Sequence, residues 1–314
     1  MKISVVIATK DRLEDLRTAI TKYLDQTYKD IEIIVIDNAS NDQTKEKIPV
    51  EFPTVKYIWL PDNIDIRAIN YGISLATGDV IWRCDDDSHP RDNDAFEKVV
   101  KILTDNSDID IIASENVEVK RGYLIWEWYP IKVDKVNIPA KGYKSHMFPG
   151  SGAAIRKEVF EKIGYFWDFG FEELDFCARA IRAGLSVRYF PNIVTYHHAA
   201  PGNRIHYDRW IKMSCQFLRL QWTYFPFCRA VGRSTIIILS QLIIAIQGFY
   251  NPFVILEGLM MMNATIIKTF RSERNPMTKE QLNDITMGAN LLKNQYVFFK
   301  QKIVGALNRW KNKK

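Results

Sequence analysis

The sequence contains few cysteines, and they follow no pattern that would bind a metal or build a disulfide framework. Among its 314 residues the four cysteines are scattered, without a C-x-x-C pair: Cys84, Cys177, Cys215 and Cys228. This spacing argues against a disulfide-stabilised scaffold and a cysteine-ligated zinc site, and it favours separate reduced thiols in a cytoplasmic protein. Internal repeats and low-complexity segments are absent as well. We therefore expect an ordinary globular protein.

The opening MKISVVIATKDR lacks the features of a secretory signal. Its apolar run is too short, and charged residues follow where a signal would have small ones. We expect this stretch to form the first strand of the fold instead.

The body of the chain has little excess charge of either sign. The net charge is +6, and residues 300–314 account for all of it, with six basic residues and no acid. A nucleic-acid-binding protein more often carries basic residues through the body of a domain. This distribution argues against a nucleic-acid partner.

Long uninterrupted hydrophobic runs are also missing. The most apolar stretch, Ser234–Tyr250, is interrupted by Gln241 and Gln247, and Asn251-Pro252 separates it from the next one. A membrane-spanning helix needs about 20 mainly apolar residues. We expect residues 206–314 to form a helical, partly apolar region. An interfacial hairpin, a homodimer surface and plain helical packing all remain open for it.

The end of this region has the pattern of a basic amphipathic helix. Ile303, Leu307 and Trp310 recur at helical spacing, with lysines around them. Such a helix suits peripheral contact with an anionic membrane surface, and a solvated basic helix end is the alternative.

Strands alternate with helices along the first 90 residues. Apolar β-branched runs predict strands at Ile3–Ala8 and in IEIIVIDNAS, VKYIWL and VIWRC. Helical spacing predicts a helix over 13–24 and a shorter one over Ile66–Ala76. Asp11, followed by Glu14 three residues later, predicts a capping box for the first helix. The repeated strand–helix–strand order predicts an α/β fold with a parallel sheet.

The pattern continues less regularly over residues 91–205. An extended or antiparallel element is expected between Ile109 and Pro139. Helices follow at Lys157–Ile163 and Glu172–Ala183, each ending at a glycine, and then a strand, SVRYFP. We therefore expect one α/β domain over residues 1–205.

Acidic residues gather where two of the expected strands end. Asp37 ends the second strand, and Asp85, Asp86 and Asp87 directly follow the fourth. In open α/β sheets ligands bind outside the carboxyl ends of the strands. Adjacent carboxylates repel one another unless a cation joins them, and hard divalent cations prefer oxygen ligands. The triplet therefore indicates a metal site, with a solvated acidic turn as the alternative.

Taken in order, these motifs resemble the family 2 glycosyltransferases with the GT-A fold, within the bacterial rhamnosyl- and galactofuranosyl-transferase-like group. The resemblance covers about the first 200 residues. It is carried by SVVIATKDR, IIVIDNASNDQT, ATGDVIWRCDDDSHP, GSGAAIRKEVFEKIGYF, FEELDFCARAIRAGLSVRYFP and VTYHH. It implies a nucleotide-sugar half over about 1–90 and an acceptor half over about 91–205.

The resemblance also implies roles for particular residues. Nucleotide-binding positions correspond to Thr9, Asp11, Asp37, Arg67, Asp85 and Asp86. Asp85 and Asp87 match the D-x-D pair that binds Mg²⁺ or Mn²⁺. His197 matches a histidine that some members add to the metal, with His198 as the alternative. Cys84 stands where many relatives have an acid, which leaves a shift of the ligand pair to Asp86 and Asp87 open.

The general base is expected in FEELDF. Relatives commonly have Glu-Asp-x-Asp here, and the second acid is the base. Glu173 stands at that position, so it is the expected base, and Glu172 and Asp175 are the alternatives. A helix start enriched in acids to suit its dipole would give the same pattern without catalysis.

The expected activity is inverting transfer of a sugar from a UDP- or dTDP-sugar to a hydroxyl of a glycan or polyprenyl-linked acceptor. By analogy with the family, this would serve cell-surface polysaccharide synthesis at the cytoplasmic face of the membrane. A nucleotidyltransferase is the first alternative, although ATKDRLEDL lacks the Gly-rich basic loop that this class needs. A non-catalytic, membrane-associated protein on a degenerate transferase fold is the second.

Overall fold

A computed structural model describes residues 1–119, 132–198, 207–247 and 251–286. By its internal contacts the chain divides into two compact units, Met1–Asp168 with Glu172–Pro201, and Phe169–Phe171 with Gly202–Lys314. The boundary expected at residue 205 falls outside the described residues, so the domain limits stay a prediction.

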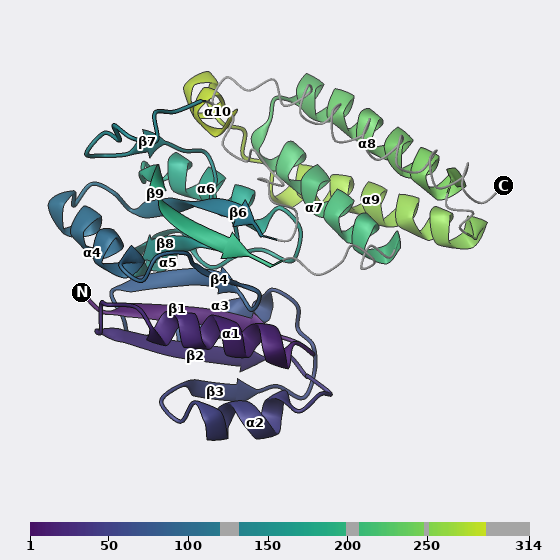
Figure 1. Ribbon diagram of the computed structural model, residues 1–314. Helices are drawn as coiled ribbons and strands as arrows, with labels where there is room; N and C mark the ends of the chain where they lie inside the picture. The colour runs from purple at the N-terminus through teal and green to yellow at the C-terminus, as the bar shows by residue number, and fades with distance from the viewer. Residues whose placement is uncertain (120–131, 199–206, 248–250, 287–314) are drawn as a thin grey trace. The chain divides into compact units, whose positions relative to one another are not determined.

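The first unit is an α/β unit whose described strands form one mixed sheet (Figure 1). Its strands are β1 (Ile3–Thr9), β2 (Ile31–Asp37), β3 (Lys56–Trp59), β4 (Val80–Asp85), β5 (Ser88–Pro90), β6 (Ile111–Glu118), β7 (Tyr143–Lys144), β8 (Ala153–Arg156) and β9 (Val187–His197). Its helices are α1 (Leu13–Leu24), α2 (Thr44–Glu51), α3 (Arg67–Ser74), α4 (Ala95–Asp105), α5 (Lys157–Ile163) and α6 (Glu172–Arg182).

The strand order is β3-β2-β1-β4-β8-β6-β9-β5, and β7 pairs with β9 outside this row. The neighbours among β3, β2, β1 and β4 pair in parallel, as the alternating sequence pattern predicts. The other half is mixed, because β8 runs antiparallel to both β4 and β6, while β6 and β9 pair in parallel. Parallel strands are covered on both faces, which explains why β1 and β2 read as nearly continuous apolar runs.

Helices pack on both faces of this sheet. One hydrophobic cluster joins it to α1, α2 and α4, and it includes Leu16, Ile48 and Phe96. The other joins it to α3, α5 and α6, and it includes Ile69 and Phe176. Side chains alternate between the two faces along β4, so that Trp82 lies in the first cluster and Ile81 in the second.

The expected capping box at α1 is wrong. Asp11 has a positive φ of 54° and lies before the N-cap residue, Arg12, which makes no side-chain cap. The carboxylate of Asp11 instead accepts a hydrogen bond of 2.6 Å from the backbone N–H of Asn41. The N–H of Leu13 donates to Asp42 at 3.3 Å, so an acid from another segment supplies the cap.

The described part of the second unit is helical, as the apolar patterning of residues 206–314 predicts. Its described helices are α7 (Tyr207–Tyr224), α8 (Phe227–Gln247), α9 (Pro252–Ser272) and α10 (Lys279–Thr286). A small buried cluster, which includes Leu218, Ile237 and Met262, joins α7, α8 and α9. In the described part of the chain, α9 alone is long and apolar enough to cross a membrane, by length and composition only. The basic pattern around Ile303 lies outside the described residues.

Candidate functional site

The carboxyl ends of three neighbouring parallel strands meet at one edge of the sheet. Thr9 at the end of β1 pairs in register with Asp37 at the end of β2, and Ala8 pairs with Asp85 at the end of β4. The acidic residues that follow separate strands in the sequence therefore share this edge, which is where ligands bind in open α/β sheets.

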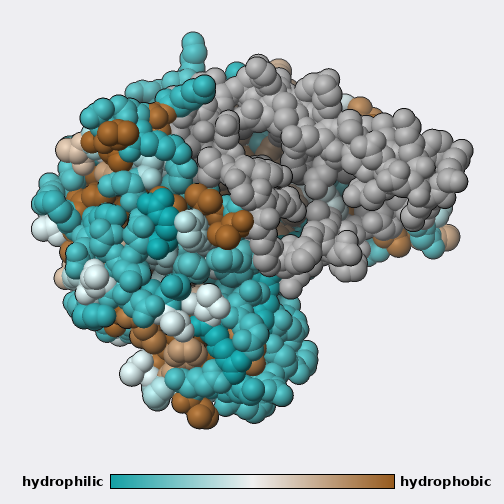
Figure 2. Space-filling model, viewed as in Figure 1, coloured by the Kyte–Doolittle hydropathy of each residue, from teal (hydrophilic) through white to brown (hydrophobic). Residues whose placement is uncertain are grey.

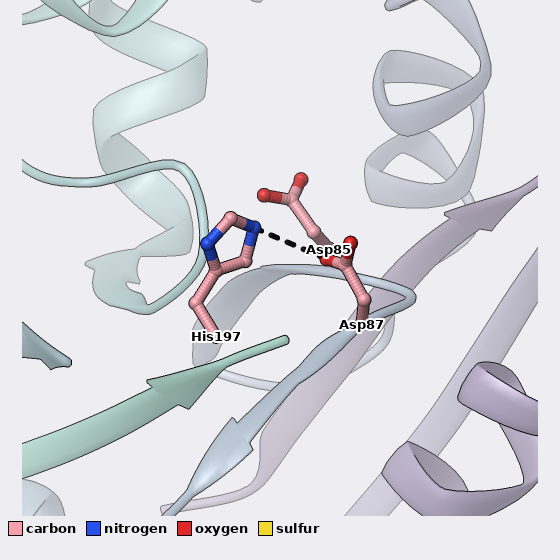
Figure 3. A group of neighbouring side chains, drawn as sticks. All are labelled: Asp85, Asp87 and His197. Carbon is pink, nitrogen blue, oxygen red and sulfur yellow. Dashed lines mark ion pairs between the residues drawn. The ribbon is translucent and has the colours of Figure 1, made fainter. Parts of the chain in front are cut away.

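Strand pairing brings a histidine from far along the sequence to the aspartate triplet. Short β5, directly after Asp87, runs antiparallel to β9, and Ser88 lies opposite His197. The structure thus gathers Asp85, Asp87 and His197, whose ligand atoms all lie within 4.8 Å of one another (Figure 3). The Nε2 atom of His197 is 3.3 Å from Oδ1 of Asp87.

The other nitrogen of His197 contacts an acid that the sequence analysis missed. Glu118 at the end of β6 lies opposite His197 in the β6–β9 register, and its Oε2 is 3.1 Å from Nδ1 of the imidazole. A carboxylate at this place orients a metal-binding histidine. His198 is directed elsewhere, because its Nε2 lies 3.2 Å from Nε2 of His89.

The charges of this group reinforce one another. Burial alone would lower the pKa of His197, but the hydrogen bond to Asp87 and the charges of Asp87, Asp85 and Glu118 raise it to about 9. Burial would raise the pKa of Asp87, but the hydrogen bond to His197 and the charges of His197 and Arg12 hold it far below its usual range. Without a metal, His197 is therefore a cation that partly neutralises the acids.

Asp86, the middle residue of the triplet, is directed away from this group. Its Oδ2 accepts a 2.8 Å hydrogen bond from the hydroxyl of Thr9, and its Oδ1 pairs with Nη1 of Arg12 at 2.8 Å. The same Arg12 nitrogen also contacts Asp87. Burial is the main cause that raises the pKa of Asp86 to about 6. Arg12 belongs to the SVVIATKDR motif, but the motif alone did not predict that Arg12 pairs with two aspartates.

Two carboxylates and an imidazole fit a small divalent cation. Magnesium and manganese prefer oxygen ligands, and an imidazole suits the softer manganese as well. The orienting contact from Glu118 is the outer support that such a histidine ligand needs. The ligand pair that the geometry favours is Asp85 with Asp87, since Asp86 is directed to Thr9 and Arg12.

The three candidate bases all lie in the first turn of α6. Asp175 is buried and pairs with Nε of Arg179 at 2.8 Å, and Glu172 is buried as well. The side chain of Glu173 is 19% exposed, and its Oε1 lies 3.3 Å from Nη2 of Arg83. Burial and then the charge of Glu172 raise the pKa of Glu173 to about 8, although Arg83 opposes this shift.

The residues matched to the nucleotide pocket are spread over several loops. Asp37 is fully buried, and its carboxylate accepts hydrogen bonds from the N–H of Ser40 at 2.7 Å and from the hydroxyl of Tyr57. Asp11 is exposed in the turn after β1. Arg67 is exposed at the start of α3, where its Nε donates to the carbonyl of Ile64 at 3.3 Å. The structure gives no contact of Arg67 with the acidic group among the described residues.

Cys84 and His146 are two buried side chains in or near the sequence motifs. Cys84 is buried in β4, and burial raises the pKa of its thiol to about 12, which rules it out as a nucleophile. His146 is buried, which lowers its pKa to about 4 and keeps it neutral.

Comparison with known sequences gives a consistent result. Residues 4–164 match the family described as glycosyl transferase family 2. A probable glycosyltransferase, YdaM of Bacillus subtilis, is 24% identical over 322 residues, which cover 89% of this chain and 76% of that protein. The dTDP-rhamnosyl transferase RfbF of Shigella flexneri is 27% identical, with 62% of this chain and 68% of that protein covered. For an uncharacterized glycosyltransferase of Nostoc sp., also 27% identical, the match spans 52% of this chain and 53% of the relative.

Solved structures share the fold. The mannosyltransferase PcManGT of Pyrobaculum calidifontis, solved with GDP-Man and Mn²⁺, superposes with a TM-score of 0.55 at 15% identity and covers 98% of this chain and 86% of its own. Residues 1–349 of S. aureus TarS, solved with UDP-GlcNAc, superpose with a TM-score of 0.54 at 16% identity. The match covers 86% of this chain and 90% of that one. These likenesses confirm the predicted α/β fold of the GT-A type with a C-terminal helical region.

Proposed function

The chain belongs to glycosyl transferase family 2, and from this premise we propose that it is a metal-dependent, inverting enzyme that uses a UDP- or dTDP-sugar. The observation that carries the proposal is the group formed by Asp85, Asp87 and His197 at the carboxyl edge of the parallel strands. Glu173, a partly exposed acid whose pKa is raised to about 8, is linked to the same group through one arginine.

On the donor side, Asp85, Asp87 and His197 would hold Mg²⁺ or Mn²⁺ against the diphosphate. The metal, when bound, stabilises the negative charge that the departing nucleoside diphosphate develops. Glu118 holds the imidazole of His197 in place, and Arg12 offsets the charge of Asp86 and Asp87.

On the acceptor side, Glu173 would take the proton of the attacking hydroxyl. The hydroxyl oxygen forms a bond to the anomeric carbon, the bond from that carbon to the diphosphate oxygen breaks, and the proton passes to Glu173. Attack from the face opposite the leaving group inverts the anomeric centre. A base works best when its pKa is near the working pH, and the pKa of Glu173, about 8, meets this condition.

The donor is proposed to carry uracil or thymine. The support is the likeness to RfbF, named as a dTDP-rhamnosyl transferase, and to TarS, solved with UDP-GlcNAc. PcManGT, solved with GDP-Man, is the reason to include guanosine donors in any test. The proposed acceptor is a hydroxyl of a glycan or a polyprenyl-linked glycan in cell-surface polysaccharide synthesis.

We further propose that the C-terminal region contacts the cytoplasmic face of the membrane. The support is the exposure of large apolar side chains on α8 and α9: Phe227, Val231, Ile236, Leu239, Ile243, Phe253, Leu256, Met260, Met261, Ile267 and Phe270. By contrast, most of the face of the first unit seen in Figure 2 is hydrophilic, and its hydrophobic residues form separate small groups. An apolar face of this kind suits the boundary of a lipid bilayer, and a homodimer interface is the competing outcome.

The function is tested by thermal unfolding across UDP-, dTDP- and GDP-sugars, each with and without Mn²⁺. We expect a rise in Tm of a few degrees that requires both the nucleotide and the metal, because a ligand that binds only the folded state stabilises it. The donor that gives the shift is then tested for transfer.

A folded sample that shows no shift with any donor would favour the non-catalytic protein on a degenerate fold. A shift with nucleoside triphosphates, followed by release of pyrophosphate, would favour the nucleotidyltransferase. Either result would overturn the proposal.

A further inference from the structure

In strand β4 the run Val80–Cys84 contains one charged residue among apolar ones. Val80, Ile81, Trp82 and Cys84 are fully buried, and Arg83 between them is only 4% exposed. Side chains alternate along a strand, so Arg83 lies on the same face as Ile81, the face that α6 covers. A buried guanidinium is costly unless anionic partners surround it.

Arg83 has such partners in two different elements. Its Nη1 donates to Oδ1 of Asp85, two residues later on the same strand face, at 2.8 Å. Its Nη2 lies 3.3 Å from Oε1 of Glu173, in the first turn of α6. Its Nε has no hydrogen-bond partner in the part of the chain that the structure describes. The guanidinium is therefore paired through Nη1 and Nη2, with the carboxylates of Asp85 and Glu173.

The loop residue Gly150 leaves the space that this arrangement needs. A Cβ atom at position 150 would collide with both Nη1 of Arg83 and Oε1 of Glu173. The loop backbone therefore packs directly against the two partners, and only glycine allows them to approach each other there.

We propose that Arg83 is a positioning residue that ties Asp85, on the donor side, to Glu173, on the acceptor side. This inference rests on the proposed function for the roles of those two acids, while the link itself stands on geometry. A guanidinium suits the task because its planar fork can hold two carboxylates at once, whereas a lysine ammonium is a single point charge. The group that holds the donor and the group that receives the proton are thereby kept at a fixed separation.

The first test needs no substrate. Among the described residues, the charged groups that act on Glu173 include Glu172 on its own helix and Arg83 and Asp85 on β4. The Tm of the metal-free protein is measured against pH for wild type and for E173Q. The difference in Tm between the two changes as Glu173 titrates, and the midpoint of that change is the pH to be compared. The same comparison is made between R83M and R83M/E173Q. We expect the midpoint to rise by about one pH unit in the R83M pair, because a favourable positive charge has been removed.

The second test is a double-mutant cycle on sugar transfer. In the wild-type background R83M should lower kcat about 100-fold, with a smaller change in the donor KM. In the E173Q background the loss of kcat caused by R83M should be clearly smaller, since one of the two acids that Arg83 positions is already gone. R83K should recover part of kcat, because it keeps the charge but cannot hold both carboxylates.

Gly150 provides an independent variant, with Gly232 as its matched control. G150A should shift the Glu173 midpoint and lower kcat in the same direction as R83M, because the added methyl group forces the pair apart. G232A should change neither, since a Cβ at position 232 would meet no atom within 4 Å. If R83M does not fold, G150A carries the midpoint comparison, and R83K and G150A carry the comparison of kcat.

Equal midpoints in the two pairs, or losses in kcat that simply add, would overturn the positioning role. The protein could transfer no sugar from any donor while the Glu173 midpoint still shifts in the R83M pair. That result would overturn the proposed function and leave the link between Arg83 and Glu173 in place.

Discussion

At the scale of single residues, Glu173 and each aspartate of the triplet lie against a cation that the protein itself supplies. Arg83 pairs with Asp85 and Glu173, and Arg12 pairs with Asp86. Asp87 contacts both Arg12 and His197. The repulsion within the aspartate triplet is therefore offset before any metal binds. The differing surroundings also separate the pKa values, with Asp86 raised and Asp87 lowered.

Asp87 is the residue whose loss should damage the metal site most. D87A removes a proposed ligand and the partner of both Arg12 and His197, so we expect transfer to fall at least about 100-fold. The measurement is transfer at saturating Mn²⁺, with circular dichroism to check the fold. D105A, at the exposed end of α4, is the control and should keep full activity. Intact transfer by D87A would show that the metal assignment is wrong.

The pH dependence of the enzyme should follow Glu173. Its pKa is raised from 4.5 to about 8, so transfer should increase with pH and level off above about pH 8, where the base is ionised. The stability of the fold should change with pH in the opposite direction. The protonated acid stabilises the fold in full below the unfolded value of 4.5, and this contribution is lost as pH rises through about 8.

E173Q should remove both pH effects, because glutamine does not titrate. Urea unfolding from about pH 5 to about pH 9 measures the stability part. An unchanged pH–rate profile in E173Q, or one that follows substitutions at Asp175 instead, would assign the base elsewhere.

At the scale of elements, hydrophobic patterning predicted most of the fold. Buried β-branched runs predicted the parallel strands β1 and β2, because strands covered on both faces cannot alternate with polar residues. The capping box of α1 was predicted wrongly, because the carboxylate of Asp11 bonds to Asn41, about thirty residues away. Local sequence rules do not include such a partner.

The candidate site was predictable only in part, for the same reason. The order of the motifs indicated Asp85, Asp87, His197 and Glu173, and strand pairing brings three of them together. Glu118 was missed, because its role depends on a β6–β9 register that no local pattern shows. The one available signal for Arg83 was a charge inside the apolar run VIWRC.

Helix α9 supports a prediction about membranes. Phe253, Leu256 and Met260 are 80%, 54% and 65% exposed on it. We expect the full chain to sediment with vesicles that contain anionic lipid, and the triple change of these residues to serine to weaken that binding about tenfold or more, because each loses buried apolar area. V50S on α2 is the control, since Val50 is 79% exposed but lies in the first unit.

A wild-type chain that ignores vesicles but forms a dimer in solution, with the dimer lost in the triple variant, would assign this face to a second copy instead.

At the scale of the whole molecule, the cations within the site predict that folding does not need the metal. Addition of EDTA should abolish transfer, and excess Mn²⁺ should restore it. The Tm of the ligand-free protein should change by less than about 2 °C, because Arg12 and His197 already neutralise Asp86 and Asp87. Calorimetry with and without EDTA makes this measurement. A large fall in Tm would mean that the metal is structural, as in proteins that unfold without it.

The three residues Phe169–Phe171 have a consequence for any attempt to divide the protein. They belong to the helical unit, where the ring of Phe171 lies 4.9 Å from that of Phe217 on α7. Phe171 also has a positive φ of 61°, a conformation that an aromatic residue adopts only under constraint from its surroundings. Glu172 is the next residue in the chain. Residues 1–201 expressed alone would keep this strained aromatic but lose Phe217, so a truncated protein with every acid of the site present would lack a packing partner of the residue next to Glu172.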